Sequence, residues 1–470
     1  MGRVSTALIK SLSEIVGSQN VHTQGERYEA SSKDATEIVS RPQLAVTVTG
    51  AAQIPAILKL SHKFNLKIVA RGAGTGLSGG SLATEDSIVL MLDKLDRIIS
   101  IDADKRMAIV EPGVITQALA DAAAAEGVFY PPDPASVAES TLGGNVAECA
   151  GGLRCKKYGV TKDYVLGLEG YLVSGELVQT GCLAENETYD LTSLLIGSEG
   201  TLLLITRIAL QLIDPPEAQR TFLATFGRQR DAAEVVARLL ALGVVPAVLE
   251  FMDGDAVVCS LDYLQLQREQ FQPDLIAGLD ADALLLIELD GSTRGIAADS
   301  VIVNEVVTRH AQLLFRMTND DREREKLWKI RRSLSKAVTA AAPLRVSEDV
   351  CVPPSRFPAL IGILPQLARD FELRVNSYGH AGDGNLHVNF LYPIDNEEGR
   401  ALIAQAALEL FKMTINLEGT ISGEHGIGLA KREFLPLEVA PTAMELLRLV
   451  KRAFDPESRL NPDKIFRTKC

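Results

Sequence analysis

Cysteine is scarce in this sequence, and the few cysteines are not arranged as metal ligands. Six occur among 470 residues, with no CxxC pair and no spacing typical of zinc or iron–sulfur sites. We therefore expect reduced, mostly buried thiols in a cytoplasmic protein. The same absence indicates that the chain carries no second redox centre of its own.

Basic charge and long apolar runs are also lacking. The net charge is −13, which argues against a general nucleic-acid or anionic-membrane surface. No apolar run approaches the length of a membrane span, and no secretory apolar region follows the start. The hydrophobic fraction of 46% and charged fraction of 23% are ordinary for a globular protein. The length predicts two or three domains with a large core.

Histidine is rare too, but half of the six histidines fall in two short glycine-rich segments, GHAGDGNLHVN from residue 379 and SGEHGIG from residue 422. Residues 374–378 and 386–391 read as strands, and Asp383-Gly384 between them is a turn signal. The predicted hairpin brings His380 and His387 together. With Glu424 they form a set that suits one divalent ion, zinc or manganese, with open coordination positions. The alternative is two hydrogen-bonded structural histidines beside a plain turn.

His425 is the neighbour of Glu424, and in an extended chain the two side chains would point to opposite faces. The flanking glycines allow the backbone to leave regular geometry. We interpret His425 as a general base, because a neutral imidazole suits proton transfer near neutral pH. A fourth metal ligand is the alternative.

The N-terminal part predicts a helix over 3–16 and then a strand, helix and strand over 42–49, 54–64 and 66–70. A GxGxxG pattern follows at 74–79. Because a new strand is predicted at 87–92, no room remains for the helix of a Rossmann unit. We expect instead a loop of backbone N–H groups, with Ser78 and Ser81, that wraps a pyrophosphate. The alternative is a plain flexible glycine loop.

A second donor-rich loop region is predicted after a strand at 107–111 and a helix at 116–126. It comprises residues 131–134, 140–145 and 150–152, in which Pro-Pro and Asp-Pro steps fix extended backbone. A strand follows at 165–173, and the glycine turn at 197–200 leads into another buried strand.

Asp214-Pro-Pro216 marks a predicted domain boundary. Strands at 221–226, 247–252 and 283–288 and a helix at 232–242 predict an α+β cap domain, an antiparallel sheet with helices on one face. Further helices are predicted at 320–342 and 400–417. On the first of these, Trp328, Arg331 and Ser335 share one face. A surface position is the usual state of an arginine in such a charged run.

Taken together, the motifs resemble a known family. The first group, RGAGTGLSGG, PPDPASVAESTLGGNVAECAGG, YGVTKDYVLGLE and IGSEGTL, resembles the FAD-binding domain of the vanillyl-alcohol oxidase family. The second group, GHAGDGNLHVN, SGEHGIG and RLNPDKIF, resembles its 2-hydroxyacid dehydrogenase branch, whose members act on glycolate, D-lactate or D-2-hydroxyglutarate. The similarity runs in order over roughly residues 40–466.

The resemblance implies a two-part FAD-binding domain over 1–215, an α+β cap domain over 216–430 and a return to the FAD domain over 431–470. It implies non-covalent FAD, because residues 71–80 contain no histidine. At Asp463 the family usually has glycine, so contacts there are less certain. The implied FAD contacts are Arg71, Gly72, Gly74, Thr75, Gly76, Leu77, Ser78, Gly79, Gly80, Ser81, Pro132, Asp133, Ser140, Thr141, Gly143, Gly144, Asn145, Gly151, Glu199, Gly200, Ile205 and Asn461.

The resemblance also implies a small 2-hydroxyacid substrate, bound by Arg331, Ser335 and Asn389. Relatives that act on a dicarboxylate have a lysine where this chain has Ser347, and an acidic pair follows it. This favours glycolate or D-lactate, although Arg345 on the same strand face could supply the missing charge.

Two functions from other classes are the alternatives: a hydrolase using the metal set, and a nucleotide-binding module without turnover. No nucleic-acid partner is expected. The electron acceptor is left open between a partner subunit, a quinone, a cytochrome and oxygen. Attachment to the inner membrane through such a partner and a homodimer are left open as well.

Overall fold

The computed structural model describes residues 5–36, 38–84, 86–185, 190–265, 281–310, 312–318 and 321–467. Within these ranges no helix has the length and apolar character needed to cross a membrane. The chain forms two compact units. The first comprises Met1–Gly151, Gly159–Pro215 and Glu424–Cys470, and the second comprises Gly152–Tyr158 and Pro216–Gly423. The domain boundaries predicted from the sequence follow residues 215 and 430. The inclusion of Gly152–Tyr158 in the second unit was not predicted.

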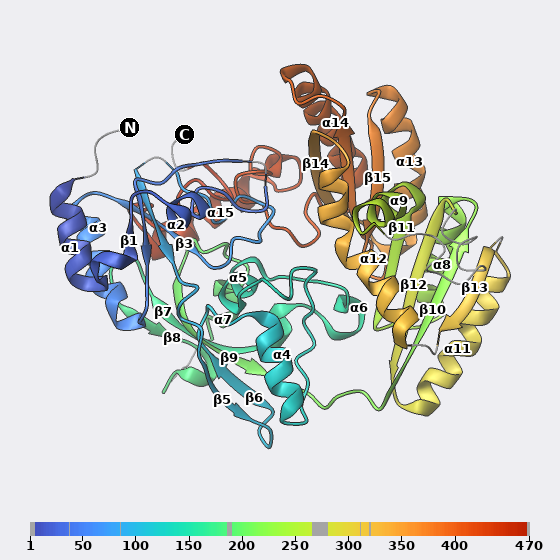
Figure 1. Ribbon diagram of the computed structural model, residues 1–470, viewed down its shortest axis with the longest axis horizontal. Coiled ribbons are helices and arrows are strands. Elements are labelled where there is room, and N and C mark those ends of the chain that lie inside the picture. The colour runs from blue at the N-terminus through green and yellow to red at the C-terminus, as the bar shows by residue number, and fades with distance from the viewer. Residues whose placement is uncertain are drawn as a thin grey trace. The chain divides into compact units, whose positions relative to one another are not determined.

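The first unit contains two sheets (Figure 1). The smaller has the order β1-β2-β4-β3, with β1 antiparallel to β2 and the other pairs parallel. Apolar residues of α1 (Thr6–Val16) and α3 (Ile54–Lys63) pack in one core cluster with its strands. The strands are β1 (Val21–His22), β2 (Leu44–Thr47), β3 (Lys67–Arg71) and β4 (Ser87–Met91).

The predicted strand–helix–strand start is confirmed, and none of the described residues between β3 and β4 is helical, as the rejection of a Rossmann unit required. The second sheet of this unit is antiparallel, with the order β5-β6-β9-β7-β8. Its strands are β5 (Ile98–Asp102), β6 (Met107–Val110), β7 (Val165–Tyr171), β8 (Leu177–Gln179) and β9 (Leu204–Gln211). The other helices of the unit are α2 (Glu26–Ala30), α4 (Thr116–Ala125), α5 (Leu142–Glu148), α7 (Thr192–Leu195) and α15 (Pro441–Phe454).

Helix α5 is a correction, because residues 140–145 were expected to be a loop. Thr141 is its N-cap and accepts a hydrogen bond from the Gly144 amide at 3.4 Å. Leu142 and Val146 bury one face of the helix. Gly143 lies so close to Pro112 that a Cβ atom there would be 2.5 Å from the proline ring. The glycines therefore serve close packing of a short helix.

The second unit is built on one antiparallel sheet with the order β13-β10-β12-β11-β15-β16-β14. The predicted α+β fold with an antiparallel sheet is thus confirmed. The strands are β10 (Ala218–Phe226), β11 (Val248–Asp253), β12 (Ala283–Gly291), β13 (Gln312–Thr318), β14 (Leu344–Cys351), β15 (Arg374–Gly379) and β16 (Asn385–Tyr392).

Helices cover both faces of this sheet, whereas the sequence predicted helices on one face. One layer is α9 (Gly254–Tyr263) and α12 (Asp321–Ala340), whose apolar residues share a core cluster with Met252 and Tyr378. Phe251, which alternates with Met252, packs against Phe357 of α13 on the other face. That layer contains α8 (Gln229–Ala241), α11 (Thr293–Thr308), α13 (Phe357–Asp370) and α14 (Glu397–Asn416). The central strand β11 is buried at every position, so it requires cover on both sides. A short helix of the joining segment, α6 (Cys155–Tyr158), also belongs to this unit.

The predicted hairpin is formed by β15 and β16, with Tyr378 opposite His387. Its connection depends on Gly384, which has φ +79°. A Cβ atom there would lie 1.8 Å from the carbonyl oxygen of Val352. Neither the conformation nor the space admits a side chain.

We expect Gly384→Ala to lower the free energy of unfolding by at least about 1–3 kcal/mol, because it adds backbone strain and a clash with a main-chain oxygen. Gly362→Ala is the matched control: it lies inside α13 with nothing within 4 Å of the new methyl group, so it should be neutral or stabilising by up to about 1 kcal/mol. Urea denaturation of the full chain measures both. Equal stability of the two variants would show that the hairpin tolerates a side chain at 384.

Candidate active site

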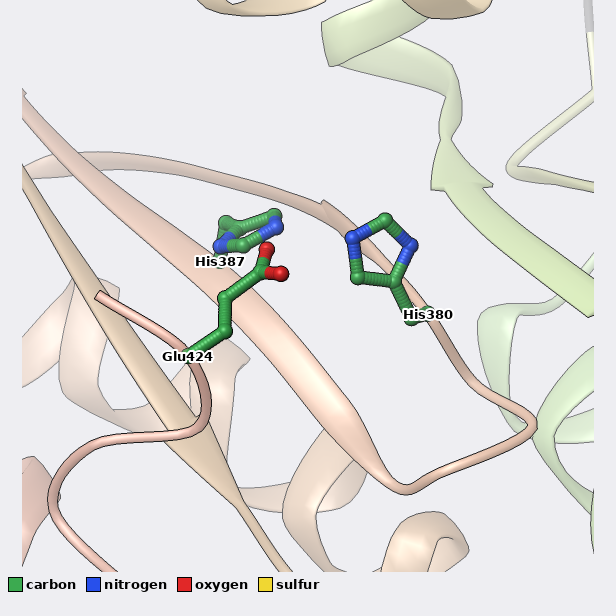
Figure 2. A group of neighbouring side chains, drawn as sticks. All are labelled: His380, His387 and Glu424. Atoms are coloured by element: carbon green, nitrogen blue, oxygen red, sulfur yellow. The ribbon is translucent and has the colours of Figure 1, made fainter. Parts of the chain in front are cut away.

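Two imidazoles meet at the end of the hairpin, as the sequence predicted. His380 follows the last residue of β15, His387 lies in β16, and their ring centroids are 5.5 Å apart with the planes at 88°. Both side chains are buried. Glu424 joins them: ligand atoms of the three residues all lie within 4.8 Å of one another. Figure 2 shows the three side chains pointing toward one another.

Close packing of Gly423 precedes Glu424. A Cβ atom at Gly423 would lie 1.7 Å from the side-chain Nδ2 of Asn385, at the start of β16. Glycine lets the chain pass close to this side chain on the strand that carries His387, and Glu424 is the next residue. The donor set of two imidazoles and one carboxylate fits a divalent ion with open positions, after small rotations of the side chains.

Glu250 is a carboxylate that the sequence analysis did not identify. It lies in β11 with no exposed surface, and its Oε1 accepts a hydrogen bond from His380 Nδ1 at 2.6 Å. Its Oε2 accepts from Arg331 Nε at 2.5 Å. A carboxylate only accepts, so Nδ1 of His380 carries the hydrogen and Nε2 is the nitrogen suited to bind a metal. The sequence does contain a signal for Glu250: an acidic residue inside an otherwise apolar strand. Such a residue is expected to be buried and must then bond to a cation or another hydrogen-bond donor.

Arg331 is 2% exposed, so the surface position considered from the sequence is wrong. Its guanidinium carbon lies 5.2 Å from the centre of the Tyr378 ring, which in turn is 5.4 Å from the His387 ring. Besides the bond from Nε to Glu250, its Nη2 has no hydrogen-bond partner in the part of the chain that the structure describes. This buried cation therefore has donor capacity that suits a small anion.

The other predicted substrate residues lie near Arg331 in the chain or in the sheet. Ser335 is one turn further along α12 and is half-buried. Asn389 is two residues after His387 in β16, hence on the same strand face, and is fully buried. Its Oδ1 accepts from Nε and Nη2 of Arg345 at 3.1 and 2.8 Å.

The segment after His425 is held by Glu199, which the sequence assigned to FAD. The carboxylate of Glu199 accepts hydrogen bonds from the backbone amides of Ile427 at 2.8 Å and Gly428 at 2.7 Å. Gly426 has φ +81°, and a Cβ atom there would lie 2.6 Å from Glu148 and 3.0 Å from Glu199. The predicted departure from regular backbone is thus confirmed. Burial, and then the charge of Glu199, raises the pKa of Glu148 well above its usual range.

The predicted flavin loops of the first unit come together at Asn461. Its side-chain amide donates to the carbonyl oxygens of Gly80 at 2.9 Å and Glu199 at 2.6 Å. Within the described ranges, the buried Asn461 Oδ1 and Ser78 Oγ have no hydrogen-bond partner. Gly72 packs on Thr141, where a Cβ atom would lie 2.1 Å from the hydroxyl oxygen. These unsatisfied polar atoms beside bare glycine backbone fit a polar ligand such as FAD.

Several other predicted contacts have roles within the protein. Ser140 Oγ and the Asn145 amide both hydrogen-bond to Thr116 Oγ1, at 2.9 and 2.8 Å. Ile205 lies in β9. Asp463 has φ +63°, a conformation that favours glycine and is also tolerated by aspartate.

Comparisons with known proteins identify the family of the chain. Residues 215–465 match the model for the FAD linked oxidases, C-terminal domain, and residues 42–181 match an FAD binding domain. The chain is 35% identical to glycolate oxidase subunit GlcD of Bacillus subtilis, covering 97% of this chain and 96% of that protein. It is 32% identical to a D-lactate dehydrogenase of Anaerostipes hadrus, covering 91% and 90%. Among solved structures it is similar to 4-ethylphenol oxidase from Gulosibacter chungangensis, with a TM-score of 0.78 over 99% of both chains at 17% identity, which shows the fold.

We expect Glu250→Gln to weaken divalent metal binding by about 10–100-fold. A glutamine that still accepts from Arg331 turns its amide hydrogens toward His380, which then carries its hydrogen on Nε2 and loses the metal-facing lone pair. Competition with a chromogenic chelator for Zn²⁺ measures this.

Glu288→Gln is the matched control, since Glu288 is buried in the neighbouring strand β12 and accepts from Thr221. It should keep the wild-type affinity. Unchanged affinity in folded Glu250→Gln protein would contradict the role assigned to Glu250.

Proposed function

Because the chain belongs to the FAD-linked oxidase family, we propose that it oxidises a 2-hydroxyacid to the 2-oxoacid and passes the hydride of C2 to FAD. One observation carries the proposal: the buried Arg331 guanidinium has an unpartnered nitrogen and is tied through Glu250 to the His380 end of the histidine cluster. A 2-hydroxyacid carries an anionic group next to a hydroxyl, which matches a cation close to a metal-type site.

Arg331 binds the substrate carboxylate in this proposal. Its position is fixed by Glu250 and by the Tyr378 ring, so little conformational freedom is lost on binding. A charge-assisted hydrogen bond of this kind contributes about 1.5–3 kcal/mol. Ser335 and Asn389 are proposed to complete the polar contacts.

His380, His387 and Glu424 are proposed to hold one zinc or manganese ion. A divalent ion bound there stabilises alkoxide character at the substrate oxygen as the hydride leaves. The ligand positions are set by the hairpin and by the hydrogen bond from His380 to Glu250. Burial of both imidazoles strengthens electrostatic interactions in the site.

His425 is proposed to be the general base that takes the hydroxyl proton, because it adjoins Glu424 but does not belong to the ligand group found in the described residues. Glu199 acts on the same segment by binding the amides of residues 427 and 428. Glu199 is therefore a positioning residue for His425.

FAD is proposed to lie against residues 71–81 and 140–145, with support from 199–200. It accepts the hydride when bound. Two electrons must then leave, and we propose a separate acceptor: a partner subunit, a quinone or a cytochrome. The glycolate oxidase relatives are described as subunits, which favours the first of these. Cytoplasmic location, with or without attachment to the inner membrane through that acceptor, is part of the same proposal.

We expect the flavin to separate from the protein when the protein is denatured. We expect acid precipitation to leave the yellow colour in the supernatant, because the first glycine loop contains no histidine to which a flavin could be attached. Absorbance of supernatant and pellet measures this. Colour in the washed pellet would disprove non-covalent binding, and a colourless protein that hydrolyses esters or amides would contradict the whole proposal.

Variants at 387 and 425 separate metal binding from proton transfer. His387→Ala should lose both metal and turnover while keeping FAD. His425→Asn should keep metal and FAD but lose about 10²–10⁴-fold in turnover, the usual range for an acid–base group. Metal analysis together with a dye-linked assay distinguishes the two. Loss of metal in His425→Asn would instead make His425 a ligand.

A further inference from the structure

A second arginine is buried on the same face of the seven-stranded sheet as the histidine cluster. Arg345 in β14 is 7% exposed, and its hydrogen bonds go to neutral oxygens. Nε and Nη2 donate to Asn389 Oδ1, and Nη1 donates to Thr339 Oγ1 at 2.7 Å. Arg345 forms no ion pair with any residue that the structure describes. A buried guanidinium without a counter-ion is costly, so this position suits an anion supplied from outside the chain.

Arg374 provides the contrast within the same sheet. Arg345 and Arg374 lie in the two strands that flank β16, and both are opposite Leu391. Arg374 is paired with Asp255, Nη2 to Oδ1 at 2.8 Å. The fold therefore neutralises one of these two arginines and leaves the other with amide and hydroxyl partners alone.

Arg331 is one end of a short line of residues on α12, and Arg345 contacts the other end. Arg331, Ser335 and Thr339 follow one another at four-residue intervals on α12, so they line one side of the helix over about 12 Å. Arg331 contacts Glu250 at one end of this line, and Thr339 contacts Arg345 at the other. Asn389, which Arg345 holds, shares its strand face with His387. The candidate metal cluster and the two cations thus border the same face.

We propose that Arg345 forms a second anion subsite, which binds the distal carboxylate of a short 2-hydroxydicarboxylate while Arg331 binds the carboxylate next to the reacting carbon. This inference rests on the proposed function and names its substrate class. It reverses the preference for glycolate or D-lactate that was expected from Ser347 and the acidic pair after it. Glu348 lies on the opposite strand face from Arg345, since neighbouring residues of a strand alternate. Asp349 shares the strand face of Arg345, but it lies opposite His387 in the strand register, two positions beyond Ser347 and Asn389.

The rival explanation is that Arg345 only orients the Asn389 amide. Both roles predict lower activity when Arg345 is replaced, but they differ in selectivity. If Arg345 forms an anion subsite, its replacement lowers activity toward substrates with a second carboxylate. If it only orients Asn389, its replacement lowers activity toward all substrates alike. The comparison therefore needs two substrates in every variant.

The experiment measures kcat/KM for D-2-hydroxyglutarate, D-malate and D-lactate with one dye acceptor, in wild type, Arg345→Met, Arg345→Lys and Arg374→Met. We expect wild type to prefer a dicarboxylate. Arg345→Met should lower kcat/KM for that dicarboxylate by about 10–100-fold, the equivalent of one charge-assisted bond, and that for D-lactate by less than about threefold. Arg345→Lys should keep part of the preference, and Arg374→Met should keep all of it.

Calorimetric binding of 2-oxoglutarate and pyruvate gives a second readout that does not depend on turnover. Arg345→Met should weaken 2-oxoglutarate binding and leave pyruvate binding unchanged. Wild type that oxidises D-lactate well but dicarboxylates poorly would overturn this inference and leave the proposed function standing. Equal losses for all substrates would overturn it in favour of the orienting role. If wild type oxidises no 2-hydroxyacid, the proposed function fails, and the binding of 2-oxoglutarate alone decides whether Arg345 is an anion subsite.

Discussion

The candidate site depends on one buried carboxylate. Glu250 has no exposed surface and bonds to a histidine through one oxygen and to an arginine through the other. Removing it would leave a guanidinium buried without its partner, a loss that costs about 3–5 kcal/mol for buried ion pairs. It also determines which nitrogen of His380 faces the cluster. A single residue in the middle of a sheet thus sets the chemistry of a candidate metal ligand and the position of a candidate substrate cation.

The seven-stranded sheet explains how such polar residues are tolerated in a core. Apolar residues of α9 and α12 cover the same sheet face with Met252, Tyr378 and Leu391. The polar residues therefore lie among apolar neighbours, and each must find a partner within the protein or a ligand. Arg331 Nη2, buried without a partner in the described ranges, is one atom for which the chain itself does not meet this requirement. Buried polar atoms left unsatisfied in this way are the physical mark of a binding site.

Local patterns in the sequence were sufficient to predict much of this arrangement. The glycine turn at 383–384 and the alternation of β16 predicted the convergence of His380 and His387, because both are properties of a hairpin alone. The short spacing between β3 and β4 likewise excluded a Rossmann unit. What could not be predicted depends on contacts between distant segments. Glu250 lies 130 residues from His380 along the chain. Glu199 lies more than 200 residues from the two backbone amides whose hydrogen bonds it accepts. Two further features were not predicted: the presence of helices on both sheet faces and the short helix α5. Both depend on burial against neighbouring segments and not on local periodicity.

We propose that 2-hydroxyacid oxidation uses the flavin and the histidine cluster together. The direct measurement is the anaerobic half-reaction, in which the purified protein is mixed with a D-2-hydroxyacid and loss of oxidised flavin absorbance is followed by stopped flow. It is carried out with metal-replete protein and with protein from which the metal has been removed by a chelator. We expect rapid flavin reduction in the metal-replete protein, slow reduction in the metal-free protein, and a return of rapid reduction when zinc or manganese is added back. Flavin reduction at the same rate in metal-free protein would contradict it.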